Sequence, residues 1–123
     1  MKIVVDTNVF LSGVFFGGVP GLILQAWRDR RLDFILSVAI FNEYQRAGER
    51  LAERFGGIEI GGLLLLLASS CEFVDPPPLP RQLCTDPDDD KFIACALAAH
   101  CPIIVSGDRA LLRQSGHSGI AVL

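Results

Sequence analysis

Hydrophobic residues in this chain form short unbroken runs that are separated by longer stretches of mixed character. Short continuous runs are typical of strands buried on both faces, since a strand covered by helices on both sides exposes no polar face. The first run, "KIVV", is rich in residues that favour strands. The predicted strands cover residues 2–5, 34–36, 71–74, 102–105 and 120–123.

Between these runs, hydrophobic residues recur at steps of three and four, the spacing of one buried helix face. Ser37 is a suitable N-cap for one such helix, whose buried face includes Ile40 and Tyr44. Another helix has a strong start signal, with Asp86 at the N-cap and Pro87 at the first helical position. The predicted helices cover residues 22–30, 38–55, 63–70, 87–100 and 109–114.

Strands that alternate with helices indicate an α/β fold, with a parallel sheet wrapped by helices on both faces. The 123 residues suffice for one domain and not for two, so we expect a single domain over residues 1–123. The segment "DPPPLP" is expected to be irregular, because its prolines lack backbone donors.

Composition narrows the class of protein. Half of the residues are hydrophobic, which is typical of a globular protein, and a formal net charge of -3 argues against one that coats nucleic acid through a basic surface. The four cysteines have neither paired spacing nor partner histidines, so they are read as reduced thiols. Asp6 and Asn8 interrupt the first apolar run, which excludes a signal peptide, and no run approaches the ~20 residues of a membrane span. We therefore expect a cytoplasmic protein without membrane contact.

Acidic residues stand where the predicted strands end or where the helices begin. Asp6 follows the first strand and Asp108 follows the fourth, while a run of aspartates, residues 86–90, opens the helix that leads into that fourth strand. Glu43 lies in the second turn of the helix that follows residues 34–36. Loops that follow parallel strands gather at one edge of the sheet, so these acids are expected to converge there.

Each acid alone has a simpler explanation, since an aspartate after a strand is most often a helix N-cap and Glu43 alone is typical of a solvated helix surface. Four carboxylates brought together repel one another, and the sequence supplies no adequate set of nearby cations. An all-oxygen cluster of this kind suits Mg²⁺ or Mn²⁺. Such ions activate water for attack on a phosphodiester, so no nucleophilic side chain is needed.

Four segments together resemble the PIN-domain family, in the group often labelled as toxins of bacterial toxin-antitoxin pairs: "IVVDTNVFLSG", "SVAIFNEY", "DPDDDKFIACALA" and "PIIVSGDRALL". They follow the family's order and spacing over essentially the whole chain. The resemblance implies a three-layer α/β/α sandwich with a central, mostly parallel sheet. It also implies a nuclease that hydrolyses single-stranded RNA with Mg²⁺ or Mn²⁺, an antitoxin protein as partner, and a homodimer.

The resemblance carries roles over to particular positions. The acids that match the family's metal-binding and catalytic acids are, in order, Asp6, Glu43, Asp89 and Asp108. Asp90 is the alternative for the third. The residues that match small polar positions beside these acids, and would support them, are Thr7, Asn8 and Ser106.

Other readings remain open. The chain is alternatively a PIN-like RNA- or protein-binding module without turnover, or a metal-free ribonuclease that uses His100 and His117, whose activity would survive EDTA. A phosphoacceptor receiver domain is disfavoured, because Asp6 has no acidic neighbour.

Basic residues lie near the predicted acids. Three arginines recur every four residues on the helix that carries Glu43 and would either guide RNA phosphate or pair with Glu49 and Glu53 on a solvated face; they are Arg46, Arg50 and Arg54. Lys91 and Arg109 adjoin the acids and are better placed to touch phosphate.

Overall fold

A five-stranded sheet runs through the centre of the computed structural model, which describes residues 1–123. The strands are β1 (Lys2–Val5), β2 (Asp33–Leu36), β3 (Glu72–Phe73), β4 (Ile103–Val105) and β5 (Ala121–Val122). Their order is β3-β2-β1-β4-β5, and every neighbouring pair is parallel. The chain therefore reverses its direction of travel across the sheet between β1 and β4, the kind of position at which parallel sheets bind ligands.

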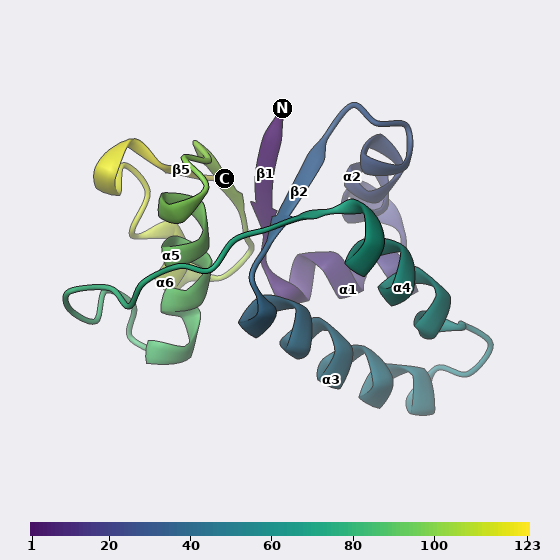
Figure 1. Cartoon of the computed structure of the whole chain (residues 1–123). Coiled ribbons are helices and arrows are strands. Elements are labelled where there is room, and N and C mark those ends of the chain that lie inside the picture. The colour runs from purple at the N-terminus through teal and green to yellow at the C-terminus, as the bar shows by residue number, and fades with distance from the viewer.

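Helices cover both faces of this sheet. In chain order they are α1 (Thr7–Phe15), α2 (Gly18–Arg28), α3 (Val38–Arg54), α4 (Ile60–Ser70), α5 (Asp90–Ala98) and α6 (Arg109–Leu112), with short 3₁₀ turns η1 (Pro87–Asp89) and η2 (His117–Gly119). Figure 1 shows α1 to α4 on one side of β1 and β2, with α5 and α6 on the other. The predicted α/β/α sandwich is thus confirmed.

Helix α1 is the one helix that the hydrophobic pattern did not predict. The Asp6 carboxylate accepts a hydrogen bond from the Val9 amide at 2.8 Å and so starts the helix. Gly13 lets α1 approach α2 closely, since a Cβ atom there would lie 2.7 Å from the Pro20 carbonyl oxygen. The glycine that weakens the helical pattern is therefore required by the packing of α1 against α2.

The start of α5 also differs from the prediction. Asp86 does act as an N-cap and Pro87 follows it, but the first turn is the tighter 3₁₀ turn η1. The Asp86 carboxylate accepts from the Asp88 amide at 2.9 Å, two residues away, which favours this tight turn. Asp89 is the last residue of η1, and Asp90 begins α5.

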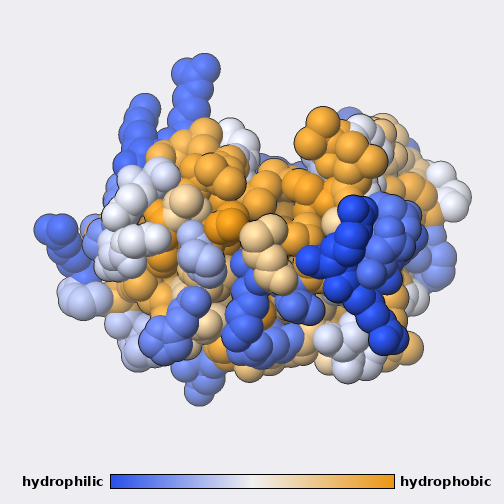
Figure 2. Space-filling view, turned by 90° about the horizontal axis from the view of Figure 1, so that it is seen from above, coloured by the Kyte–Doolittle hydropathy of each residue, from blue (hydrophilic) through white to orange (hydrophobic).

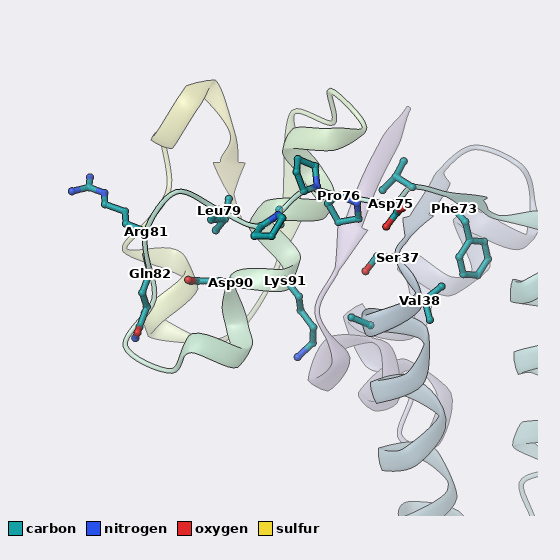
Figure 3. Close-up of a pocket in the computed structure, with 15 residues that line it drawn as sticks. Ser37, Val38, Phe73, Asp75, Pro76, Leu79, Arg81, Gln82, Asp90 and Lys91 are labelled. Atoms are coloured by element: carbon teal, nitrogen blue, oxygen red, sulfur yellow. The ribbon is translucent and has the colours of Figure 1, made fainter.

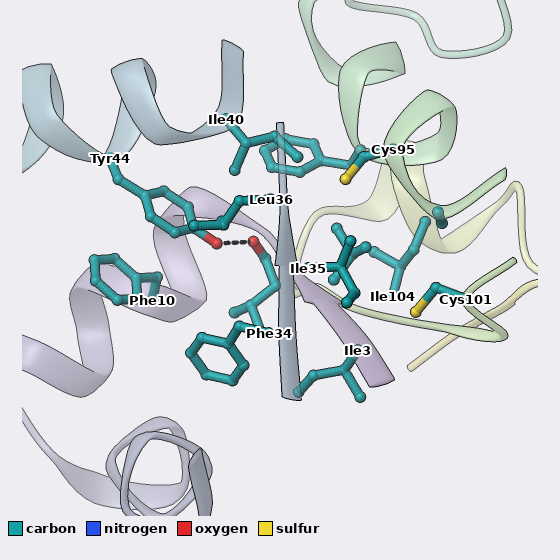
Figure 4. Close-up of a cluster of buried hydrophobic side chains, with 14 of the residues drawn as sticks. Ile3, Phe10, Phe34, Ile35, Leu36, Ile40, Tyr44, Cys95, Cys101 and Ile104 are labelled. Carbon is teal, nitrogen blue, oxygen red and sulfur yellow. Dashed lines mark hydrogen bonds between the residues drawn. The ribbon is translucent and has the colours of Figure 1, made fainter. Parts of the chain in front are cut away.

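The Tyr44 side chain joins α3 both to α1 and to the end of β1. Tyr44 is fully buried, its ring stacks on Phe10 with centroids 4.2 Å apart, and its hydroxyl donates to the Val5 carbonyl oxygen (Figure 4). Glu43 is adjacent to Tyr44 and Asp6 is adjacent to Val5. The hydrogen bond between Tyr44 and Val5 therefore brings the two predicted acids Glu43 and Asp6 near each other.

A proline-rich strap, defined here as residues 74–86, crosses from β3 to η1 in front of the sheet (Figure 1). The Asp90 carboxylate fastens its far end by accepting from the amides of Leu83 at 2.9 Å and Cys84 at 2.7 Å. The Gln114 side chain adds a hydrogen bond to the Leu83 carbonyl oxygen at 3.0 Å. The strap is thus held although it has no regular structure.

Hydrophobic side chains also reach the surface. Figure 2 shows them across the middle of the end of the molecule that points up in Figure 1, with hydrophilic residues around the margin. Elsewhere Phe16, Val19 and Leu22 are largely exposed on and beside α2.

No single helix is both long and apolar enough to cross a membrane. Helices α1 and α2 reach that length and composition only when taken together, and they are bent by 92°.

Candidate active site

The four predicted acids line one cavity of about 260 Å³ at the carboxyl edge of the sheet. Asp6 follows β1, and Asp108 caps α6 just beyond β4. Glu43 projects from the second turn of α3, and Asp89 ends η1. The cavity lies at the point between β1 and β4 where the chain reverses its direction across the sheet. The structure thus brings together acids from four separate segments.

Ser106 links two of these acids. Its hydroxyl donates to Asp6 Oδ2 and accepts from the Asp108 amide at 2.9 Å. Both acids also cap helices, because Oδ1 of Asp6 accepts from Val9 and Oδ1 of Asp108 accepts from the Ala110 amide at 2.7 Å. The simple N-cap explanation and a place in the cavity therefore hold at once for both acids. Capping orients each carboxylate and leaves Oδ2 of Asp108 without a hydrogen-bond partner.

Glu43 is held on both sides. Thr7, which is buried, donates its hydroxyl to Oε1, and Lys91 Nζ lies 2.6 Å from Oε2. Lys91 also reaches the Asp88 carbonyl oxygen at 2.8 Å and an Asp88 carboxylate oxygen at 3.2 Å. The side chains of Lys91 and Glu43 are only 14% and 22% exposed, so this ion pair is partly shielded from water. The predicted neighbour Lys91 therefore lies beside the acids and neutralises one of them.

Asp89 and Asp90 are separated by the structure. Asp89 lines the acid cavity, and its carboxylate takes part in no hydrogen bond or ion pair, although its amide donates to the Asp86 carbonyl oxygen at 3.0 Å. Asp90 lies on the wall of a different cavity, with both carboxylate oxygens engaged by the strap. The geometry favours Asp89 over Asp90 as the third acid. Asp88, which sequence reasoning did not select, also lines the acid cavity.

Burial, with a smaller effect of neighbouring charges, raises the pKa values of Asp6 and Asp89. Burial raises the pKa of Asp6, and the charges of Asp108 and Glu43 add to this, while the hydrogen bonds from Ser106 and Val9 oppose it. Burial, followed by the charges of Asp108 and Asp86, raises the pKa of Asp89 to about 6, against an opposing effect of Lys91. Lys91 therefore compensates only part of the negative charge, which leaves the cavity suited to a further cation.

The basic residues divide into two groups. Arg46 and Arg50 line the acid cavity, whereas Arg54 lies over the Phe55 ring at 5.7 Å from its centroid. None of the three arginines forms an ion pair with Glu49 or Glu53, so the solvated-pair interpretation is not supported.

The predicted Arg109, His100 and His117 are absent from the lining of the acid cavity, whereas the predicted Asn8 and Thr7 belong to it.

The donor chemistry of the cavity fits a hard divalent cation, because the acids and the neighbouring hydroxyl and amide groups offer oxygen ligands alone. In their present positions, however, no three His, Cys, Asp or Glu side chains stand close enough together to hold one ion. Thr7 and Lys91 engage the two oxygens of Glu43. A metal ion that used Glu43 as a ligand would therefore compete with one of these bonds.

The part of the chain that matches known proteins includes the whole site. Residues 2–110 match a family model described as PIN domain. The chain is also 30% identical over 115 residues to "Uncharacterized protein MJ1680" of Methanocaldococcus jannaschii, across 91% of this chain and 74% of that protein. The range matched by the family model includes all four acids and the residues that hold them.

Proposed function

This chain belongs to the PIN domain family, whose members are generally nucleases, and from that premise we propose that it is a metal-dependent endoribonuclease that hydrolyses single-stranded RNA. The observation that supports this best is the convergence of Asp6, Glu43, Asp89 and Asp108 on one cavity. Arg46 and Arg50 stand on the same wall and supply the positive charge that attracts a phosphate.

The four acids would hold one or more divalent ions, which PIN-domain nucleases typically use. A bound Mg²⁺ or Mn²⁺ supplies an activated water and stabilises the charge that develops on the phosphodiester. Ser106 keeps Asp6 and Asp108 in a fixed relation through its two hydrogen bonds. Thr7 fixes the direction of the Glu43 carboxylate, and Asn8 lies exposed on the cavity lining. Rigid placement of this kind is what such a site needs.

Replacement of Asp6 by asparagine tests this proposal, because it keeps the shape of the side chain and removes its charge. We expect Asp6→Asn to lower cleavage of unstructured RNA in Mg²⁺ or Mn²⁺ by about a thousandfold, since several kcal/mol of transition-state stabilisation would be lost. Asp33→Asn is the matched control, because the Asp33 side chain is 72% exposed and lies at the start of β2, at the opposite edge of the sheet from the acids.

Equal cleavage by Asp6→Asn and the native protein would refute the proposed site. Cleavage that persists in EDTA would favour a metal-free mechanism. Tight RNA binding without cleavage in either metal would favour the alternative of a binding module, which keeps the acids but has no turnover.

We also propose that the nuclease is the toxin of a toxin-antitoxin pair that acts in the cytoplasm, as a homodimer inhibited by an antitoxin protein. The exposed Phe16, Val19 and Leu22 are consistent with a protein partner, since clustered exposed hydrophobic residues often mark interfaces. Expression of the native chain should then stop growth, and expression of Asp6→Asn should not. A monomer by light scattering at high protein concentration would refute the homodimer.

A further inference from the structure

A second, larger cavity lies beside the acid cavity. It has a volume of about 680 Å³, within the range of about 300–1,000 Å³ typical of small-ligand sites. Figure 3 shows that it opens between the start of α3, with Ser37 and Val38, and the start of α5, beneath the proline-rich strap. We call it the strap cavity. Nothing in the proposed hydrolysis uses it.

The strap cavity meets the acid cavity at Lys91. Lys91 lies on the wall of the strap cavity, while its ammonium group bonds to Glu43 and Asp88 of the acid cavity. Figure 3 shows Lys91 pointing away from the strap and Asp90 pointing the other way, toward the end of the strap. The Lys91 side chain therefore links the wall of the strap cavity to two residues of the acid cavity.

The walls of the strap cavity suit a flat, partly apolar group. Val38 is 64% exposed and Phe73 is 39% exposed, although both are hydrophobic, and both line the cavity, where the Phe73 ring is held edge-on by Phe41 with centroids 5.9 Å apart. Aromatic side chains of this kind stack on nucleic-acid bases without strong sequence preference. The Asp75 carboxylate makes no hydrogen bond or ion pair within the protein and is free to accept from a base amino group.

The strap that covers the cavity is held at both ends by hydrogen bonds within the protein. The Val74 amide donates to the Leu36 carbonyl oxygen at 2.9 Å at one end of the strap, and Asp90 holds the other end. The prolines between these points restrict the backbone further. A rigid cavity loses little conformational freedom when it is filled, which favours a weakly held group such as one base of a flexible strand.

We propose that the strap cavity binds one nucleobase of the RNA substrate, from a nucleotide adjacent to the phosphodiester held at the acids. This inference rests on the proposed ribonuclease function and adds a base subsite to it. Val38 and Phe73 provide the apolar contact and the strap forms the cover. The subsite increases the affinity for unpaired RNA and takes no part in the chemical step.

A nuclear magnetic resonance titration of the native protein without metal tests the subsite directly. The probes are the four ribonucleoside 5′-monophosphates, with ribose 5-phosphate as the control that lacks a base. We expect the amide signals of Val38, Phe73 and Leu79 to shift with the nucleotides and to stay unchanged with ribose 5-phosphate. Shifts that are the same for both kinds of probe, or that are confined to the acid cavity, would overturn the proposal.

A variant that fills the cavity provides the second test. Val38→Trp adds bulk at an exposed position at the start of α3, and it should raise KM for single-stranded RNA about tenfold with kcat nearly unchanged, because one stacked base is lost from binding. Leu65→Trp is the matched control, since Leu65 is 72% exposed on α4 and lines no part of the strap cavity.

The two tests distinguish failure of the subsite from failure of the proposed function. If the native protein cleaves RNA and Val38→Trp behaves like Leu65→Trp, the base subsite is wrong and the nuclease proposal stands. If the nucleotides shift the three amide signals but no RNA is cleaved in Mg²⁺ or Mn²⁺, the subsite stands and the hydrolytic function is wrong.

Discussion

Replacement of Lys91 by glutamine probes the ion pair at the centre of the acid cavity. The variant keeps a polar side chain, one atom shorter, but removes the charge that Glu43 faces at 2.6 Å. The side chains of the pair are 14% and 22% exposed, so the loss leaves a partly shielded carboxylate with only Thr7 as its donor. A hydrogen bond to a charged group contributes about 1.5–3 kcal/mol, and we expect Lys91→Gln to lower the free energy of unfolding by about 2 kcal/mol in EDTA at pH 7.5.

The control for this experiment is a second lysine of the same chain. Lys2 Nζ lies 3.2 Å from a Glu72 carboxylate oxygen, but both side chains are close to half exposed. Exposed ion pairs contribute less than about 1 kcal/mol, so Lys2→Gln should have a much smaller effect. Urea unfolding monitored by far-UV circular dichroism measures both variants, and equal losses would show that shielding by the fold adds nothing to the Lys91 pair.

The same measurement in Mg²⁺ or Mn²⁺ tests whether a metal ion replaces Lys91. A ligand at one hundred times its dissociation constant stabilises a folded protein by about 2.7 kcal/mol. If a divalent ion binds Glu43, it should stabilise Lys91→Gln more than the native protein, because in the variant the ion does not compete with the ammonium group. The deficit of the variant should then shrink with metal. A deficit of the same size in EDTA and in metal would refute the exchange of Lys91 for an ion at Glu43.

Three further changes address the rest of the site. The pKa of Asp89 is raised to about 6, so the folded state binds a proton more strongly than the unfolded state, and the contribution of Asp89 to stability should fall as pH rises from about 4 to 6. Asp89→Asn should therefore be more stable than the native protein at pH 7.5 in EDTA and equal to it at pH 4. A series of melting temperatures across this pH range checks the sign. Asp90→Asn removes the charge that two strap amides bind and should make residues 74–86 more sensitive to limited proteolysis, with no such change for Asp33→Asn. Tyr44→Phe leaves the Val5 carbonyl oxygen without its donor in the core and should cost about 1–3 kcal/mol in urea unfolding; an unchanged midpoint would contradict the structural role of this bond.

The local pattern of the sequence was sufficient for most of the fold. Runs such as "KIVV" and "PIIV" predicted strands correctly, because a strand buried on both faces needs continuous hydrophobic residues whatever surrounds it. The N-cap at Ser37 was also correct, since capping is a local hydrogen bond from Ile40 to the Ser37 hydroxyl. Helix α1 was not predicted, and the close approach of α1 to α2 at Gly13 is a tertiary contact that no local pattern contains.

The candidate site shows the same division. The sequence by itself determined which acids follow strands and begin helices, and the parallel arrangement of the strands was enough to expect them at one edge. The resemblance selected Asp89 with Asp90 as the alternative, and only the tertiary structure showed that the strap amides of Leu83 and Cys84 bind the Asp90 carboxylate and leave that of Asp89 in the cavity. The tertiary structure also decided that Lys91 meets Glu43, a residue 48 positions earlier in the chain. Such pairings depend on how α3 and α5 pack, and that packing is set by contacts across the whole core, not by neighbours in the sequence.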